Sequence, residues 1–475
     1  MALVDTCVPD NLTVEQLRTI VSDAKNYALS HGLGLRVKEN PNDDLLQLLP
    51  ISLFPTPFPR NHFEFAKCIQ TSVNKMMHKI AFDNSFLSDH LKQTVEVDSF
   101  TKSLLNVHTR VLKEGRSQEI SLGLFRSDYM LNETPEALRQ IEVNAISVSF
   151  GGLSQITSNL HRYIMSKYNP LPNFHDALPN VNTSSKLAKG LAGAWDAYGK
   201  SSAVILFVLE DVVLNISDQR YIEYSLFEMR PEIKVIRKNF RELPEITRLR
   251  DNQLLFVGNE EVAVVYFRTA YAPEQYDSRL WDLRVLIEKS KAIKCPSIHY
   301  QLAGVKKIQQ ILTRKEVLDK FIEPKEADAV YSTFAKIWGL EMNEEGDYAL
   351  ELGLNHPEAY VLKPQREGGG NNYYGNEIVQ TLTSLRQSKQ REAFILMELI
   401  KPRPIKNFTI RHSQEVTLTP DQVTSELGIF GVILGSENDF KLNYEAGYVL
   451  RTKSTSVQEG GISSGFGVID TPYLY

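Results

Sequence analysis

The chain has 475 residues, a formal net charge of −5, and 42% hydrophobic and 23% charged residues. This composition is typical of a soluble globular protein, and the length exceeds one ordinary core, so we expect two or three domains or one elaborated enzyme fold. Lysine and arginine are dispersed along the chain and form no basic stripe, which argues against a nucleic acid or an anionic membrane as partner.

Cysteine and histidine usage excludes several further classes. The three cysteines, Cys7, Cys68 and Cys295, are far apart and lack CxxC spacing, which predicts neither a disulfide framework nor a zinc site and fits a reducing, cytoplasmic location. No HExxH or G-x-S-x-G motif occurs, so metalloprotease and serine-hydrolase chemistry are disfavoured. No apolar run reaches the roughly 18 to 20 residues of a membrane span, and no signal peptide is expected at the acidic N-terminus.

Helical periodicity alternates with short strand-like runs, which predicts a mixed α/β fold. The first helix begins at a capping box formed by Thr13 and Gln16 and carries an apolar face at Leu17, Ile20, Val21, Ala24 and Ala28. Helices are expected over 14–31, 62–82, 98–114, 185–198, 305–322 and 327–338. Strands are expected over 120–125, 203–209, 262–267 and 394–396.

Residues 204–304 are expected to form a separate βαβ unit. A strand that begins near residue 204 is followed by a helix over 218–228 and a second strand over 233–237. This order is typical of two parallel strands joined by a crossover helix. The segment is therefore interpreted as an inserted domain.

The stretch Lys363-Pro-Gln-Arg-Glu-Gly-Gly-Gly-Asn-Asn372 follows an apolar run and combines cations, a carboxylate and three glycines. Glycines adopt positive φ and let backbone N–H groups approach phosphate oxygens closely. The lysine precedes the glycines, so neither the GxxxxGK[ST] nor the GxGxxG pattern applies. An exposed flexible loop remains an alternative, although the charges favour a nucleotide phosphate site over a Gly/Ser linker.

Other predicted strands carry polar side chains that could complete a nucleotide phosphate site. Glu142 and Asn144 lie two residues apart, so they share one face of a strand and supply oxygen ligands suited to Mg²⁺. Arg451 and Lys453 repeat this spacing as cations, before the glycine-rich stretch 459–465. Arg126 and Arg268 follow apolar strands, where an arginine can bind a carboxylate or phosphate in bidentate fashion. The alternative for Glu142 and Asn144 is a solvated strand face. The alternative for Arg126 and Arg268 is that each is an edge residue whose charged end reaches into solvent.

These motifs also carry a family resemblance that covers nearly the whole chain. The sequence resembles the eukaryotic glutathione synthetases at Phe54-Pro-Thr-Pro57, Arg126-Ser-Asp-Tyr129, Gln140-Ile-Glu-Val-Asn144, Ser147-Val-Ser149, Asp218-Gln219, Ala263-Val-Val-Tyr-Phe-Arg268, Gln301-Leu-Ala-Gly304, Lys306-Lys307, Lys363 to Asn372, Ile395-Leu-Met-Glu398, Ser425-Glu-Leu-Gly428 and Leu450-Arg-Thr-Lys453. So many motifs in the same order are highly specific.

The resemblance implies an α/β ATP-grasp fold with an inserted βαβ substrate domain and a lid. The body would comprise residues 1–203 and 305–475, with the lid over roughly 335–420 and the substrate-binding domain over 204–304. It implies ATP-dependent, Mg²⁺-requiring ligation of γ-glutamylcysteine to glycine through an acyl phosphate, which gives glutathione, ADP and phosphate. A cytoplasmic homodimer with small-molecule substrates is expected.

The resemblance also implies roles for residues that match the family's motifs. The Mg²⁺ ligands would be Glu142, Asn144 and Glu367. The catalytic cations would be Arg126, Lys306, Lys363 and Arg451. ATP would be bound by Glu142, Lys306, Lys363, Glu367, Gly368, Gly369, Gly370, Asn371, Asn372, Tyr374, Met397, Glu398, Leu399, Ile400, Glu426, Lys453 and Glu459. The dipeptide or acceptor would be bound by Arg126, Ile146, Ser147, Val148, Ser149, Asn215, Gln219, Arg268, Thr269, Ala270, Tyr271, Arg451, Ile462 and Ser463.

Three departures from the family pattern keep alternatives open. Val212-Val-Leu214 replaces a charged stretch before Asn215, which affects contacts to the glutamyl end of the dipeptide. Ala270 stands where glycine is common, and Ser463-Ser464 replaces a small apolar pair near the acceptor site. Hydroxyls there are compatible with an acceptor such as serine. The remaining alternative is a non-catalytic homologue that acts as a binding or regulatory protein.

Overall fold

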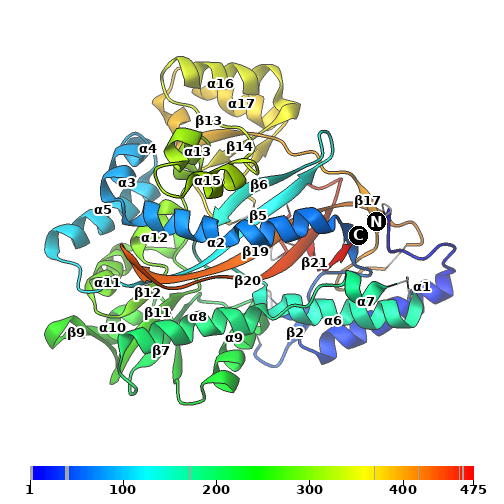
Figure 1. The fold of residues 1–475 in the computed structure, drawn as a ribbon, viewed down its shortest axis with the longest axis horizontal. Coiled ribbons are helices and arrows are strands. Elements are labelled where there is room, and N and C mark those ends of the chain that lie inside the picture. Colours follow the sequence, from blue (N-terminus) through cyan, green and yellow to red (C-terminus); the bar gives the residue numbers. More distant parts are fainter. Residues whose placement is uncertain are drawn as a thin grey trace.

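The computed structural model describes residues 4–37, 42–169, 171, 173–368, 370–415, 417–458, 460–462 and 465–475. A central sheet of eight strands runs through the molecule (Figure 1). Its strands, in spatial order, are β18 (Thr409–Ile410), β3 (Ile51–Ser52), β21 (Gly467–Asp470), β20 (Asp439–Ser454), β19 (Asp421–Ser436), β5 (Ser121–Asn132) and β6 (Ala137–Asn144), and β17 (Ile405–Asn407) pairs with β19. Strands from both halves of the chain therefore form one sheet.

A second sheet of six strands is formed within residues 204–295. Its strands are β8 (Val235–Asn239), β7 (Val204–Leu209), β11 (Glu260–Phe267), β10 (Leu254–Val257) and β9 (Thr247–Arg250) in spatial order, with β12 (Ile293–Cys295) paired to β11. The β8–β7–β11–β12 pairings are parallel, and every residue of β7 is buried. A parallel strand that is covered on both faces explains the continuous apolar run from Val204 to Leu209.

A third, four-stranded sheet lies at the top of Figure 1. It contains β13 (Ile337–Gly339), β16 (Phe394–Glu398), β14 (Tyr360–Pro364) and β15 (Tyr373–Tyr374) in antiparallel order, and α16 (Glu344–Asn355) and α17 (Asn376–Leu385) pack against it. Two small sheets pair β1 (Gly34–Arg36) with β2 (Leu46–Leu48) and β4 (Thr56–Phe58) with β22 (Pro472–Leu474).

The remaining helices surround these sheets. They are α1 (Val14–Ser30), α2 (Arg60–Phe82), α3 (Asn84–Leu91), α4 (Thr94–Val97), α5 (Ser99–Glu114), α6 (Gly151–Tyr168), α7 (Phe174–Ala177), α8 (Thr183–Tyr198), α9 (Ile216–Met229), α10 (Leu243–Ile246), α11 (Ser278–Lys289), α12 (Ile298–Ala303), α13 (Lys306–Leu312), α14 (Lys315–Leu318) and α15 (Pro324–Tyr331). Short 3₁₀ turns are η1 (Asp251–Gln253), η2 (Pro273–Gln275), η3 (Pro357–Ala359) and η4 (Lys389–Ala393). The mixed α/β class expected from the sequence is confirmed.

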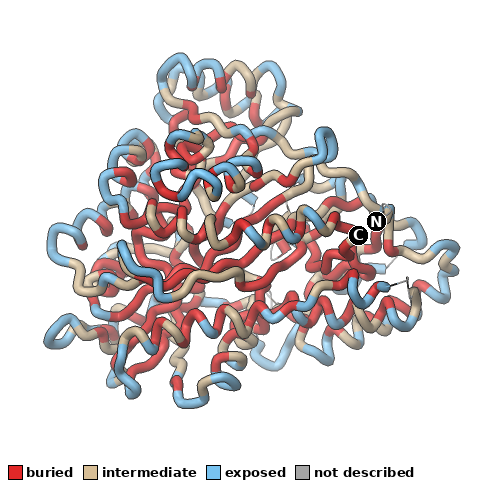
Figure 2. Tube along the Cα trace, in the orientation of Figure 1, coloured by how far each residue is buried: buried red, intermediate tan, exposed pale blue. Residues whose placement is uncertain are grey.

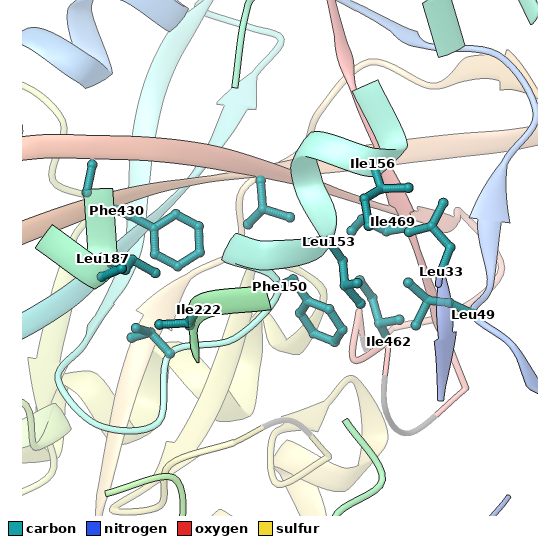
Figure 3. Packing of buried hydrophobic residues seen from close by; sticks show 14 of the residues in the cluster. Leu33, Leu49, Phe150, Leu153, Ile156, Leu187, Ile222, Phe430, Ile462 and Ile469 are labelled. Atoms are coloured by element: carbon teal, nitrogen blue, oxygen red, sulfur yellow. The ribbon is translucent and has the colours of Figure 1, made fainter. Parts of the chain in front are cut away.

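Two large apolar cores lie on opposite faces of the central sheet. Along β19, Phe430 and Val432 belong to the core that includes α8, whereas Ile429 and Ile433 belong to the core that includes α2. This alternation follows from the period of two residues in a strand. Figure 2 shows the buried central strands between partly exposed helices, and Figure 3 shows part of the first core.

The first helix follows the local sequence signals closely. In α1 the Thr13 side chain accepts from the backbone N–H of Gln16, whose side chain accepts from the Thr13 N–H, which confirms the capping box. The buried residues of α1 are Leu17, Ile20, Val21, Ala24 and Ala28. The strand predicted near 394–396 is confirmed by β16. The apolar run before the glycine-rich stretch lies in β14.

Two helix predictions were wrong in the segment that leads to the third sheet. The helix expected over 305–322 is broken, because α13 ends at Leu312, and the Thr313 hydroxyl bonds back to the Gln310 carbonyl at 2.7 Å. The helix expected over 327–338 ends with α15, and Ile337–Gly339 forms β13 against β16. Pairing with a distant strand overrides the local helical pattern there.

The sequence predicts neither a membrane-spanning helix nor a disulfide framework. Within the described part of the chain, no helix has the length and apolar character needed to cross a membrane. Cys7, Cys68 and Cys295 are free thiols, the first and last of them buried, which agrees with the absence of a predicted disulfide framework.

Candidate active site

Two adjoining cavities lie between the third sheet, the central sheet and the second sheet. Cavity A has a volume of about 200 Å³ and cavity B about 550 Å³. Five residues line both cavities and therefore mark their junction, namely Arg126, Asn144, Gly368, Arg451 and Gly461. A ligand in one cavity can thus reach a ligand in the other at this point.

Neighbouring strands of the central sheet bring the polar side chains of cavity A together. In the sheet register Arg126 of β5 lies opposite Asn144 of β6, and Glu426 of β19 lies opposite Arg451 of β20. Glu142 and Lys453 lie two residues from Asn144 and Arg451, respectively, on the same strand faces. Residues that are more than 300 positions apart in the chain thus meet at one end of the sheet.

Asp128 is the centre of this cluster, although the sequence analysis assigned it no role. It accepts hydrogen bonds from Arg126 Nε at 2.7 Å and Nη2 at 2.8 Å, and from Asn144 Nδ2 and Arg451 Nη2, both at 2.8 Å. Its side chain is fully buried. Asp128 lies two residues after Arg126, so the sequence placed both on one strand face, as it did Glu142 and Asn144. Asp128 holds both arginines at the junction of the cavities.

Lys306 and Lys363 place positive charge beside Glu142. Lys306 Nζ donates to Glu142 Oε2 at 3.0 Å, and Lys363 Nζ donates to the Ile141 carbonyl at 3.4 Å. Burial raises the pKa of the Glu142 carboxyl, but Lys306, Lys363 and Arg451 outweigh burial and hold that pKa well below its usual range. Glu142 is therefore ionised near neutral pH.

Burial raises the pKa of two other carboxyl groups at the site. Burial raises the pKa of Glu367 to about 7, Lys306 opposes the shift, and the negative charge of Glu142 adds to it. Burial also raises the pKa of Glu426, against the effect of Arg451 and with that of Asp128. Carboxyl groups that resist ionisation together indicate space for a cation.

The donor set fits a hard metal ion. Asn144 uses its amide nitrogen for Asp128, which leaves the amide oxygen as a ligand beside the carboxylates of Glu142 and Glu367. Two carboxylates and one amide oxygen suit Mg²⁺, which typically takes its remaining ligands from phosphates and water. Among the described residues, no group of three or more His, Cys, Asp or Glu side chains is arranged to hold a metal by itself. A nucleotide would have to complete the coordination.

The glycine-rich stretch forms the wall between the cavities. Gly368 and Gly370 have φ values of 83° and 89°, in the left-handed region that favours glycine, as expected from the sequence. The loop is anchored at its base, where Gln365 Oε1 accepts from the backbone N–H of Lys307 at 3.0 Å. Gly369 lies outside the described residues.

Arg268 organises the inner wall of cavity B. It donates to the Val148 carbonyl, to Ser149 Oγ at 2.9 Å and to Tyr266 Oη at 3.1 Å, and it lies 3.6 Å from Asp218. Asp218 in turn accepts from the backbone N–H groups of Phe150 and Gly152 at 2.9 and 2.8 Å. These bonds fix the turn that precedes α6.

Three non-glycine residues at or next to this wall have left-handed backbone conformations. Ser147, Phe150 and Ala270 have φ values of 52°, 73° and 74°. Such conformations cost non-glycine residues free energy and occur most often at functional sites. Ala270 therefore adopts a backbone conformation that glycine adopts more readily. At this position the family pattern commonly has glycine.

Most of the predicted site residues line the two cavities. Those of cavity A include Glu142, Asn144, Lys306, Lys363, Gly368, Asn372, Tyr374, Met397, Glu398, Leu399, Ile400, Glu426, Arg451 and Lys453. Those of cavity B include Arg126, Ile146, Ser147, Val148, Ser149, Asn215, Gln219, Arg268, Tyr271, Glu367, Asn371 and Ile462.

A few predicted residues lie elsewhere. Thr269 lines a neighbouring cavity of about 320 Å³, and Ala270 and Gly370 line neither main cavity. Ile462 is buried in the first core near Phe150, so it anchors its loop as well as bordering cavity B (Figure 3). Glu459, Ser463 and Ser464 lie outside the described residues.

Comparisons with known proteins give a consistent picture. The model for the eukaryotic glutathione synthase, ATP binding domain, matches residues 14–474. Glutathione synthetase from Rattus norvegicus is 41% identical over 97% of both chains, and that of Homo sapiens is 40% identical over 97% of both. A solved apo structure of a glutathione synthetase-like effector from Globodera pallida is 26% identical, with a TM-score of 0.78 over 99% of this chain and 100% of that chain.

The adjoining cavities and these matches define an ATP-dependent ligase with an ATP-grasp-type fold. The chain belongs to the eukaryotic glutathione synthase family.

Proposed function

We propose that this protein joins γ-glutamylcysteine to glycine with ATP and thereby forms glutathione, ADP and phosphate. The observation that carries this proposal is the shared boundary of cavities A and B at Arg126 and Arg451. A nucleotide in cavity A would place its terminal phosphate beside the carboxylate of a peptide in cavity B. The identity of about 40% to curated glutathione synthetases over nearly the full length supports this choice of substrates.

The reaction proceeds in two steps. A carboxylate oxygen of the cysteinyl residue attacks the γ-phosphorus of ATP, the bond from that phosphorus to the β,γ-bridging oxygen breaks, and ADP leaves. The acceptor amine then attacks the acyl carbon, inorganic phosphate leaves with the C–O bond electrons, and the amine loses a proton. Phosphoryl transfer requires positioning and charge stabilisation more than covalent chemistry.

The chain's cations are arranged for that stabilisation. Lys306 and Lys363 line cavity A, and Arg126 and Arg451 lie at the junction, where negative charge builds up on the transferred phosphoryl group. Because Asp128 hydrogen bonds to both arginines, their guanidinium groups need not reorganise during the reaction. Met397 and its neighbours up to Ile400 line the apolar part of cavity A and would contact the adenine.

Mg²⁺ is proposed as the metal of this site. Glu142, Asn144 and Glu367 would hold it, on the donor set described above. When bound, it would offset phosphate charge. We also propose that residues 335–420 act as the lid, that residues 204–304 form the substrate-binding domain, and that the protein is a cytoplasmic homodimer. Sedimentation analysis of the purified protein measures whether it is a dimer.

An acceptor assay tests the reaction. Purified protein with ATP, Mg²⁺ and γ-glutamylcysteine is given single amino acids, and ADP release is measured together with the mass of the product. We expect glycine to give the highest kcat/KM and a product with the mass of glutathione. A higher kcat/KM for serine or another amino acid would replace glycine in the proposal and leave the ligase chemistry intact.

The same assay addresses a non-catalytic role. A structural relative is described as an effector, but it is only 26% identical to this chain, against 41% for a synthetase. Glu142, Asn144, Lys306, Lys363 and Glu367 are all present and grouped around the cavities. Retention of these groups favours an enzyme. If no amino acid stimulated ADP release, the protein would be a binding protein on a synthetase scaffold.

A further inference from the structure

A buried ion pair outside both cavities joins α13 to the third sheet. Lys307 lies in the first turn of α13, directly after Lys306, and is only 6% exposed. It lines neither cavity A nor cavity B. Its Nζ atom forms an ion pair with Glu341, which lies two residues after β13, and donates to Gln310 Oε1 at 2.7 Å. Lys307 is thus a buried cation that the reaction described above does not use.

The side chains of residues 306 and 307 leave α13 in different directions. Lys306 lines cavity A, where its Nζ atom donates to Glu142 Oε2 at 3.0 Å, whereas Lys307 reaches the third sheet. Successive residues of an α-helix are about 100° apart around its axis. One helical turn therefore carries both side chains, and a shift of this turn moves Lys306 within cavity A.

Glu341 is held firmly within the third sheet. Its backbone carbonyl accepts from Arg391 Nη2 at 2.6 Å, and the Arg391 side chain is fully buried. A Cβ atom at Gly339 would overlap the Glu341 carboxylate, so the absence of a side chain there makes room for the carboxylate in this position. Lys307 therefore pairs with an anion that is fixed in place.

A backbone hydrogen bond joins the same helical turn to the strand that carries Lys363. The N–H group of Lys307 donates to Gln365 Oε1 at 3.0 Å. Gln365 lies two residues after Lys363, and its own N–H group donates to the Ala393 carbonyl at 3.2 Å. Lys307 thus connects the turn that carries Lys306 to β14, which carries the second lysine of cavity A.

We propose that Lys307 and Glu341 are positioning residues that hold Lys306 beside Lys363 for binding of the nucleotide phosphates. This assignment rests on the proposed function, in which both lysines of cavity A contact ATP, and deepens it. Removal of one partner from a buried ion pair leaves an uncompensated charge, which favours a shift of the turn. Displacement of a binding group by about 1 Å is enough to cost a large part of its effect.

A double-mutant cycle on nucleotide affinity tests the assignment. Binding of ADP with Mg²⁺ is measured by titration calorimetry in the wild type, Lys307→Met, Lys306→Met and the double variant. We expect Lys307→Met to raise the Kd for ADP by about 10-fold in the wild-type background. In the Lys306→Met background the same change should raise Kd by less than about 2-fold, because the residue through which Lys307 acts is absent. A merely structural role would give equal fold-changes in both backgrounds.

A charge-balanced variant separates positioning from folding. Lys307→Met leaves Glu341 buried without its partner, whereas Lys307→Met combined with Glu341→Gln removes both charges. The combined variant should keep the thermal unfolding midpoint near the wild-type value. Its Kd for ADP should still rise by about 10-fold, because the connection that holds the turn is lost.

Arg314→Met is the matched control. Arg314 Nη2 donates to both carboxylate oxygens of Glu345, at 3.0 and 2.8 Å, and this exposed ion pair also joins the α13 region to the third sheet and its helices. The variant removes one positive charge from the same region. Exposed pairs contribute little, so its Kd for ADP should equal that of the wild type.

Four results would overturn the inference. These are an unchanged Kd for ADP in Lys307→Met or in the charge-balanced variant, equal fold-changes in the two backgrounds of the cycle, an equally large rise of Kd in Arg314→Met, and failure of both Lys307 variants to fold. Wild-type affinity for ADP in Lys306→Met, or no ADP binding by the wild type, would instead refute the proposed nucleotide site, and the inference with it.

Discussion

Arg366 of the glycine-rich stretch donates a hydrogen bond from Nη1 to Oδ2 of Asp98, the residue that caps the N-terminus of α5. Asp98 is buried, and its other carboxylate oxygen accepts from the backbone N–H of Thr101 at 2.7 Å. One side chain therefore both caps α5 and holds the loop that carries Glu367. Lys389 of η4 forms an ion pair with Glu96 of α4, the helix that precedes α5.

Asp98→Asn tests this connection. Asparagine caps helices about as well as aspartate, so the helix start should be kept while the charge that attracts Arg366 is lost. We expect KM for Mg-ATP to rise by about 10-fold, since a loosened loop misplaces Glu367, and the unfolding free energy to change by less than about 1 kcal/mol. Steady-state kinetics and urea unfolding measure the two effects.

Asp83→Asn is the control for this variant. Asp83 caps α3 by accepting from the backbone N–H of Phe86 at 2.8 Å, and it has no hydrogen bond or ion pair with the described residues of the loop. Its KM for Mg-ATP should equal that of the wild type. An unchanged KM in Asp98→Asn as well would show that the ion pair does not position the loop.

Glu367→Gln tests the metal assignment. Because burial and Glu142 raise the pKa of Glu367 to about 7, loss of its charge relieves repulsion in the protein without nucleotide. We therefore expect stability to be kept or slightly increased, whereas kcat should fall by about 100-fold or more because a Mg²⁺ ligand is lost. Raising the Mg²⁺ concentration should restore part of the activity. A variant with wild-type kcat would remove Glu367 from the metal site.

Asp128→Asn should be the most destabilising conservative change in the site. It leaves Arg126 and Arg451 buried near one another without their shared carboxylate, and removal of one partner from a buried ion pair typically costs about 3 to 5 kcal/mol. Urea unfolding measures the change. Asp282→Asn breaks a surface pair with Arg110 and should leave stability near the wild-type value. Equal stabilities of the two variants would contradict the central role of Asp128.

Three buried histidines predict strong acid sensitivity. Burial lowers the pKa of His78 and of His108 to about 4 and that of His299 well below the ordinary value of 6.5. His299 bonds to Ser121 at 3.2 Å and its ring centroid lies 6.3 Å from that of His108. The unfolded chain binds protons near pH 6.5, whereas the folded protein binds them only near or below pH 4.

The sign of the effect follows from proton linkage. The stability that these histidines contribute is fully present above pH 6.5 and is lost as the pH falls toward 4, because their side chains then hold up to three more protons in the unfolded state than in the folded state. The contribution of these three histidines to the unfolding free energy should fall by as much as about 4 kcal/mol per pH unit. Urea titrations at several pH values between 7 and 5 measure this slope. His299→Gln should reduce the slope by about one proton, and an unchanged slope would exclude His299 as a contributor.

Local signals in the sequence predicted the features that depend on near neighbours. Thr13 and Gln16 predicted the start of α1, because both partners of a capping box lie within one turn. The positive φ values of Gly368 and Gly370 follow from the absence of a side chain. The shared strand face of Glu142 and Asn144 follows from the two-residue period of a strand.

The sequence by itself thus determined the α/β class, the strand faces and the residue types of the site, since these depend on spacing over a few residues. Only the tertiary structure decided which of them meet. Asp128 pairs with Arg451 across 323 positions, β13 forms where the local pattern indicated a helix, and Glu210 lines cavity B whereas the adjacent Asp211 does not and pairs with Arg241. Such relationships arise from packing between distant segments, which local periodicity does not encode.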